Sequence, residues 1–199
     1  MTKVSNRSAQ RLSHKITVTA LLSAIAFILQ YIELPVFFMP GFIKFDFSDL
    51  PALLAAFSLG PVYGVVTELI KNLVHLPVSN SAMIGELSNF ILGAAFVFTA
   101  GLIYKKDRTR KGALLGSIIG AAVMAVVSLP INYYIVYPIY ENFMPLENII
   151  GAYQAILPRV KTLWQCLLVF NVPFTLLKGL VDVLITFLIY KKLSPILHK

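Results

Sequence analysis

The sequence predicts an all-α integral membrane protein with six transmembrane helices, on the basis of its composition, its apolar runs and its charge placement. The 199 residues are 58% hydrophobic and 13% charged, whereas soluble domains carry roughly 45–50% apolar and about 25% charged residues. The mean hydropathy is +0.80. Because so few charges cannot cover a water-exposed surface, the composition excludes a soluble enzyme, a disordered chain and a disulfide scaffold.

The first predicted helix covers residues 16–34 and follows four basic side chains, Lys3, Arg7, Arg11 and Lys15. No small-residue cleavage site follows this run, so we interpret it as a retained helix rather than a signal peptide. Three further runs are near or beyond the roughly 20 residues that a helix needs to cross a bilayer. These runs are 86–104, 112–137 and 163–190.

The apolar stretch 50–76 is interrupted by Gly60-Pro61 and fits either one kinked helix or two short helices. Cytoplasmic segments carry the excess of Lys and Arg, so charge placement decides between these alternatives. If the stretch 50–76 crosses the membrane twice, the basic loop 105–111 and the C-terminal lysines both lie on the cytoplasmic side. If it crosses once, the loop 105–111 lies outside. We therefore predict helices over 49–60 and 61–76, with Pro61 at a helix start, where its missing N–H is harmless.

The resulting topology is a single membrane domain over residues 1–199 with both termini in the cytoplasm. The net charge of +8 arises from basic residues that flank the apolar spans, which indicates membrane topology rather than nucleic-acid binding. Three segments face outside: 35–48, 77–85 and 138–162. The first and third are rich in proline and aromatic residues, as expected of anchors at the membrane interface or of a lid over an outward-facing site.

Polar side chains form stripes at helical spacing inside two predicted helices. The stripes are Glu68, Lys71, Asn72 and His75 on one helix, and Asn171, Thr175, Lys178 and Asp182 on the other. The intervening helices add Glu86, Asn89, Ser128 and Asn132. Ionisable groups within spans mark an interior, a cavity or a pathway, so we predict a shared polar interior.

Two interpretations of these stripes remain open. Opposite charges one turn apart, Glu68–Lys71 and Lys178–Asp182, can neutralise each other as internal pairs. Alternatively, the side-chain amides of Asn89, Asn132 and Asn171 suit a neutral ligand, because each amide offers a donor and an acceptor.

Enzymatic chemistry finds no support in the sequence, and we predict neither catalytic residues nor a metal site. The single cysteine, Cys166, excludes an internal disulfide and a cysteine zinc cluster. No nucleophile–base set, metal-ligand spacing or nucleotide-binding loop is visible.

Small residues recur every fourth position on two of the predicted helices, which permits close helix packing. The spacing of Gly112, Gly116 and Gly120 indicates packing within the bundle. Ala20 and Ala24 lie on a helix without ionisable residues between Thr17 and Gln30, so this helix is expected to face away from the polar interior.

Six segments along the chain together resemble one known family. They are 44–53 (KFDFSDLPAL), 59–61 (LGP), 68–73 (ELIKNL), 85–90 (GELSNF), 129–134 (LPINYY) and 174–179 (FTLLKG). In this order and spacing they resemble the riboflavin-specific S components of bacterial energy-coupling factor (ECF) transporters. The resemblance implies the six-helix S-component fold and a bacterial plasma membrane location.

The resemblance further implies high-affinity capture of riboflavin, or of its phosphate FMN, from outside as a transported ligand rather than a cofactor. It implies assembly with the transmembrane protein EcfT and two ABC-type ATPases, whose ATP hydrolysis topples the S component for inward release. Ala20 and Ala24 then form the Ala-x-x-x-Ala motif that contacts EcfT. Asn132 and Lys178 would hold the flavin ring.

Further candidate binding residues are Asp46, Asp49, Glu86 and Asn89, which match the family motifs, with Asn171 and Asp182 from the polar stripe. Two alternative functions stay open. One is an S component for another vitamin, such as thiamine or folate. The other is a stand-alone transporter driven by protons through Glu68, Glu86 and Asp182.

Overall fold

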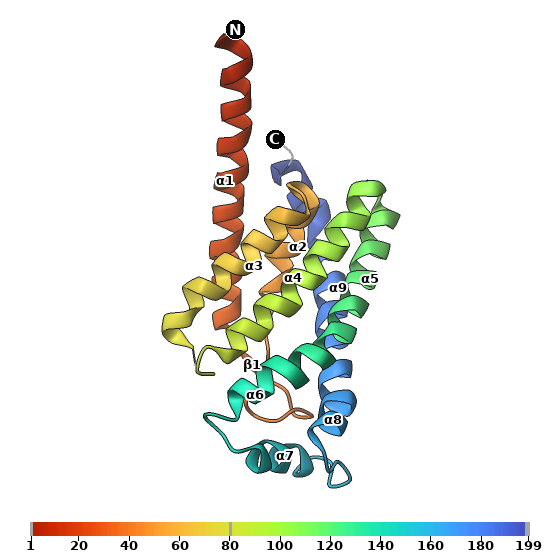
Figure 1. Cartoon of the computed structure of the whole chain (residues 1–199). Coiled ribbons are helices and arrows are strands. Elements are labelled where there is room, and N and C mark those ends of the chain that lie inside the picture. The colour runs from red at the N-terminus through yellow and green to blue at the C-terminus, as the bar shows by residue number, and fades with distance from the viewer. Residues whose placement is uncertain (1, 80, 198–199) are drawn as a thin grey trace.

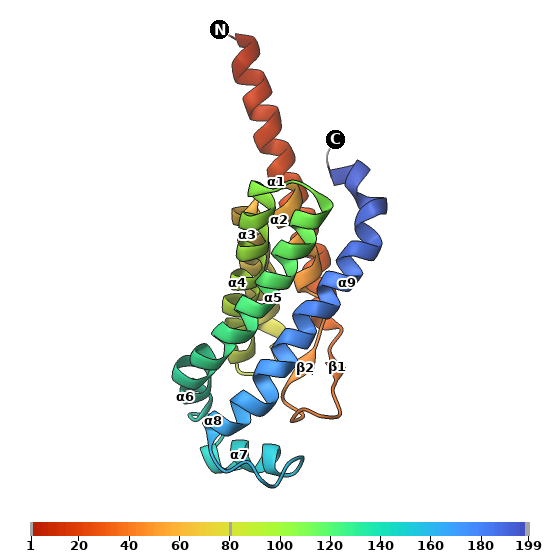
Figure 2. The ribbon, with the colours of Figure 1, turned by 90° about the vertical axis from the view of Figure 1, so that its right-hand side faces the viewer.

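The computed structural model describes residues 2–79 and 81–197 and shows an elongated helical bundle (Figures 1 and 2). Lys199 of the basic C-terminal cluster lies outside the described residues. The elements are α1 Thr2–Tyr31, β1 Leu34–Pro35, β2 Lys44–Phe45, α2 Asp49–Ser58, α3 Pro61–His75, η1 Leu76–Val78, α4 Ile84–Lys106, α5 Arg110–Ile131, η2 Asn132–Val136, α6 Tyr137–Tyr140, α7 Leu146–Gln154, α8 Leu163–Cys166, η3 Leu167–Asn171 and α9 Val172–Leu197.

Four helical stretches are long and apolar enough to cross a membrane. They are Gln10–Tyr31, Ile84–Lys106, Arg110–Tyr140 and Leu163–Ile189. α2 is a shorter apolar helix, and nine of its residues are buried among the other helices. α3 has 15 residues and buries its polar stripe. The predicted helices 49–60 and 61–76 thus correspond to two short helices, of which α2 is buried in the bundle and α3 buries one face.

The structure differs from the sequence prediction at three places. α1 begins at Thr2 rather than at residue 16, so the basic N-terminal segment is helical as well. The segment 35–48 is not an open loop, because β1 and β2 pair as an antiparallel hairpin with Leu34 opposite Phe45. The segment 138–162 contains α7, which packs Ile149 and Tyr153 into the core. Short helices and hairpins of this kind lack the length that makes a periodic pattern recognisable.

The turn between α2 and α3 depends on Gly60 and Pro61. Gly60 has a φ of 118°, a conformation that side chains with a Cβ rarely adopt. Pro61 occupies the first turn of α3, where its fixed φ favours the helix and no hydrogen bond is lost. The two residues therefore reverse the chain and confirm the predicted break.

Glycines allow α4 and α5 to pack closely. A Cβ at Gly116 would lie 2.8 Å from the Ala100 carbonyl oxygen, and one at Gly120 would lie 2.7 Å from the Phe96 carbonyl oxygen. Such distances are too short for real contacts, so larger residues there would push the helices apart. The glycine spacing on α5 serves packing inside the bundle, as predicted.

Two π-helical segments, η2 and η3, each end two residues before a proline, Pro138 and Pro173 respectively. A proline ring clashes with the carbonyl four residues earlier and cannot donate a hydrogen bond. A wider turn accommodates both effects, and such turns are frequent at functional sites. The widened turns contain Asn132 and Asn171, two of the amides that the sequence singles out.

Candidate functional site

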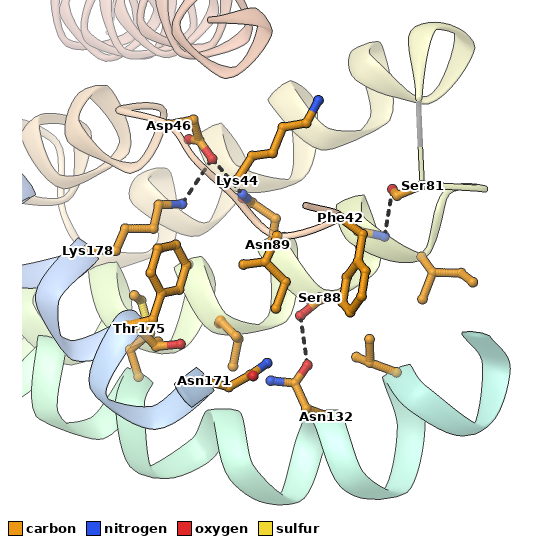
Figure 3. A pocket seen from close by; sticks show the side chains of 18 of the residues that line it. Phe42, Lys44, Asp46, Ser81, Ser88, Asn89, Asn132, Asn171, Thr175 and Lys178 are labelled. Carbon is orange, nitrogen blue, oxygen red and sulfur yellow. Dashed lines mark hydrogen bonds and ion pairs between the residues drawn. The ribbon is translucent and has the colours of Figure 1, made fainter. Parts of the chain in front are cut away.

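A pocket with a volume of about 180 Å³ lies between the hairpin, α4, η2 and α9. Figure 3 shows polar side chains from these elements around it, including Asp46, Asn89, Asn132, Asn171 and Lys178. The remaining wall is largely apolar and includes Phe42, Ile84, Leu92, Met124, Val136 and Phe174. In Figure 1 the hairpin and α6–α8 occupy the end of the bundle opposite the two termini.

Lys178 of α9 joins the hairpin side of the pocket to the helical bundle. Its Nζ lies 3.2 Å from Asp46 Oδ2 and 3.1 Å from Asp49 Oδ2. Asp46 is itself held by a hydrogen bond that the Ser48 backbone N–H donates to Oδ1 at 2.8 Å, a local turn that short acidic side chains favour. The ammonium group therefore fixes the segment that leads from the hairpin into α2.

A Lys178–Asp182 pair, one of the two interpretations left open for this stripe, does not form among the described residues. The two residues make no ion pair within 4 Å in the described part of the chain, because Lys178 turns towards the two aspartates outside its own helix. Asp182 is fully buried, and neither of its carboxylate oxygens has a hydrogen-bond partner among the described residues.

Lys71 of α3 forms the centre of a second buried cluster. Its Nζ lies 2.5 Å from Asp49 Oδ1 and 2.8 Å from Glu68 Oε2, and it donates a hydrogen bond to Ser48 Oγ at 2.7 Å. The Glu68–Lys71 pair, one of the interpretations left open by the sequence, is present, and Asp49 is an additional partner of Lys71. Asp49 bridges Lys71 and Lys178, so the two charged stripes share one carboxylate.

A chain of amides continues from this charged cluster to α1. Asn89 Nδ2 donates to Asp46 Oδ2 at 3.5 Å, and Asn72 Nδ2 donates to Asn89 Oδ1 at 3.4 Å. Gln30 Nε2 in turn donates to Asn72 Oδ1 at 3.0 Å. Polar groups on α1, α3 and α4 are therefore connected to the pocket through hydrogen bonds that also orient the Asn89 amide.

The aromatic end of the pocket positions Asn171. Tyr153 donates its hydroxyl to Asn171 Oδ1 at 2.6 Å, and the hydroxyls of Tyr153 and Tyr137 lie 2.5 Å apart. Burial raises the pKa of Tyr153, which lies on α7, well above its usual value, so its hydroxyl stays neutral and available as a donor. Ser88 Oγ fixes the other amide by donating to Asn132 Oδ1 at 3.3 Å.

Sequence reasoning missed the residues that support these amides, notably Tyr137, Tyr153 and Phe42. The Phe42 ring packs edge-on against Tyr153 at 6.0 Å, so the hairpin closes against α7. For Phe42 and Tyr153 the signal in the sequence is the aromatic content of segments 35–48 and 138–162, which fitted either interface anchors or a lid and identified no contacts.

Six of the eight predicted binding residues line the pocket. They are Asp46, Asp49, Asn89, Asn132, Asn171 and Lys178. Glu86 and Asp182 are absent from the lining in the described residues. Glu86 instead lies 2.8 Å from His75 Nδ1 and accepts hydrogen bonds from Ser79 and Ser81, so its carboxylate stabilises the connection between α3 and α4.

Ala20 and Ala24 lie on the outer surface of α1, and both are exposed. Their neighbours Leu21 and Ile25 are exposed as well, at 60% and 40%. Thr19, Ser23 and Ala26 are buried against the bundle. The two alanines therefore present a shallow, apolar strip to the surroundings of the bundle.

The described residues contain no group of three or more His, Cys, Asp or Glu side chains arranged to hold a metal ion. The pocket is lined by three amides, two lysines (Lys44 and Lys178), two aspartates (Asp46 and Asp49) and apolar walls. These groups can bind an organic molecule that combines hydrogen-bonding edges with apolar faces. Fold and site together define a helical membrane protein with an internal pocket that combines polar groups and apolar walls.

The chain belongs to the family of ECF transporter substrate-specific components, whose model matches residues 14–190. It is 35% identical to the riboflavin transporter RibU of Staphylococcus aureus (strain TCH60), with 93% of each chain covered. It is 30% identical to the riboflavin transporter FmnP of Bacillus subtilis (strain 168), covering 91% of this chain and 92% of the relative. These likenesses confirm the family resemblance found in the sequence.

A solved structure has the same architecture. It was described as "Structure and mechanism of the S component of a bacterial ECF transporter" and aligns with a TM-score of 0.75 at 34% identity. The alignment covers 94% of this chain and 99% of that chain.

Proposed function

We propose that this chain is the riboflavin-binding S component of an ECF transporter. The observation that carries the proposal is the pocket, in which Asn132, Asn171 and Lys178 face apolar walls. Riboflavin combines a flat, largely apolar ring with an edge of carbonyls and an N–H, and a chain of hydroxyls. Amides and an ammonium group can satisfy the polar edge, while aromatic and aliphatic side chains cover the ring.

The orientation of the chain follows from its charges. The α4–α5 turn and the termini lie at one end of the bundle (Figure 1), and the basic clusters in and beside them are expected to face the cytoplasm. The pocket lies near the opposite end, so riboflavin enters from outside. Six crossings, with α2 and α3 as a short pair, are consistent with this arrangement.

Purification of the protein alone in detergent tests the ligand, because bound flavin is yellow and its fluorescence returns on denaturation. We expect Asn132→Ala to weaken riboflavin binding about tenfold, because a buried ligand group then loses its hydrogen bond. Asn148→Ala is the matched control, since Asn148 is exposed on α7 outside the pocket. A colourless wild-type preparation that leaves added riboflavin fluorescent would contradict the assignment of riboflavin as the ligand. It would favour another vitamin, such as thiamine or folate.

Energy for import is proposed to come from partner proteins. The chain is the non-enzymatic capture subunit, and it docks on EcfT and two ABC-type ATPases in the bacterial plasma membrane. ATP hydrolysis then topples the S component, so that the pocket opens inward. The exposed strip at Ala20 and Ala24 supports this docking, because small residues let helices approach closely.

We expect Ala20→Trp or Ala24→Trp to abolish co-purification with EcfT and to leave riboflavin binding unchanged. A tryptophan fills the shallow strip and prevents close approach of a second helix. Val126→Trp is the control, because Val126 is 70% exposed on α5, away from this strip. Normal complex assembly by both alanine variants would exclude this surface as the docking site.

A further inference from the structure

A second cavity lies at the opposite end of the bundle from the riboflavin pocket. It has a volume of about 420 Å³ and is lined by the α2–α3 turn, the start of α3 and the end of α4, together with Lys15 of α1. Figure 1 places the α2–α3 and α4–α5 turns at the end where the termini lie. None of these residues takes part in the proposed riboflavin site.

Three cationic side chains face this cavity: Lys15, Lys105 and Arg108. The cavity lining contains no acidic residue among the described positions. Within the described residues, none of these three side chains forms an ion pair within 4 Å. The cavity therefore carries a local positive charge that the protein itself does not neutralise.

The floor of the cavity is built from closely packed elements, and Lys105 and Arg108 are exposed at its rim. The Lys15 Nζ lies 5.2 Å from the centre of the Tyr63 ring, a cation–π contact that fixes its position beside α3. A Cβ at Gly101 would lie 2.9 Å from Pro61 Cα, so α4 and the start of α3 are in direct contact. These contacts hold one cation and the cavity floor in place.

The position of the cavity along the helices identifies its environment. Lys105 lies at the end of the span Ile84–Lys106, and Arg108 follows before the next span begins at Arg110. Basic residues immediately beyond the ends of spans lie at the depth of the lipid headgroups. Anionic headgroups attract each such residue appreciably.

We propose that this cavity binds the phosphate group of an anionic phospholipid. The three cations bind the charged oxygens, as ammonium and guanidinium groups bind phosphate elsewhere, while Tyr63 and Phe57 line the same cavity and contact the apolar part of the lipid. A free phosphate would present the same charged oxygens, so the test separates the two sources.

Native mass spectrometry of the full chain in detergent measures the retention of phosphatidylglycerol and of phosphatidylcholine. The shift of the thermal unfolding temperature on addition of inorganic phosphate tests whether the cavity binds a free anion from solution. We expect K15Q/K105Q/R108Q to retain phosphatidylglycerol at least about tenfold less than the wild type, because the removal of each cation weakens the attraction severalfold. Phosphatidylcholine retention should not change.

R11Q/K106Q/K111Q is the matched control. It removes the same three charges at the same end of the bundle, from exposed residues that do not line the cavity. Loss of phosphatidylglycerol preference in the cavity variant alone supports the lipid site. Stabilisation by phosphate that only the cavity variant loses, without a lipid preference, supports a phosphate site supplied from solution. The proposal is overturned if the cavity variant and the control variant retain phosphatidylglycerol equally and respond equally to phosphate. It is also overturned if the wild type neither prefers phosphatidylglycerol over phosphatidylcholine nor is stabilised by phosphate.

Discussion

Lys71→Met is expected to lower the free energy of unfolding by about 3–5 kcal/mol, since removing one partner leaves buried charges uncompensated. Lys71 is fully buried and lies against Asp49, Glu68 and Ser48. Methionine has a similar length and retains the packing, so the change removes the charge rather than volume. We expect most of the loss to come from the two carboxylates that then lack their ammonium partner.

The measurement can use Cys166, which is buried and the only cysteine in the chain. A thiol-reactive dye labels it only after unfolding, so the denaturant midpoint in detergent reports stability. Lys44→Met is the control, because Lys44 pairs with Glu33 in a partly exposed position, where an ion pair contributes about 0–1 kcal/mol. A double variant, Glu68→Gln with Lys71→Met, should recover part of the loss. Equal midpoints for Lys71→Met and Lys44→Met would contradict this account.

Helical periodicity predicted which polar side chains share a face, and the Glu68–Lys71 pair follows directly from that spacing. It could not predict partners from other elements. Lys178 illustrates the limit, because Asp182 is one turn away in sequence, yet Asp46 and Asp49 are its actual partners. Their approach depends on how the hairpin and α2 pack against α9, and a local pattern contains no such information.

The π-helical turns ahead of two prolines were not predicted from the sequence. Pro138 and Pro173 follow π-helical turns that contain Asn132 and Asn171, and only the structure shows that these turns orient the amides. The Tyr137–Tyr153–Asn171 hydrogen bonds join α6, α7 and η3. Because α7 is a nine-residue helix in a segment predicted as a loop, the Tyr153 contribution could not be anticipated.

Lys178→Ala is expected to weaken riboflavin binding more than tenfold. The side chain lines the pocket and also holds Asp46 and Asp49. Its loss removes a donor from a largely desolvated site and frees the segment that connects the hairpin to α2. Fluorescence titration in detergent measures the affinity, and stopped-flow mixing measures the dissociation rate, which we expect to rise.

Asp182→Asn is the control that separates the pocket from the polar stripe. Asp182 lies one turn from Lys178, yet in the described part of the chain it does not line the pocket and makes no hydrogen bond through its carboxylate. We therefore expect its substitution to change riboflavin affinity by less than about threefold, a difference below 1 kcal/mol. Both variants must first retain Cys166 protection, so that affinity is compared between folded proteins. Equal affinity of Lys178→Ala and the wild type would exclude Lys178 from the binding site, and a large loss in Asp182→Asn would show that the two stripe residues act together after all.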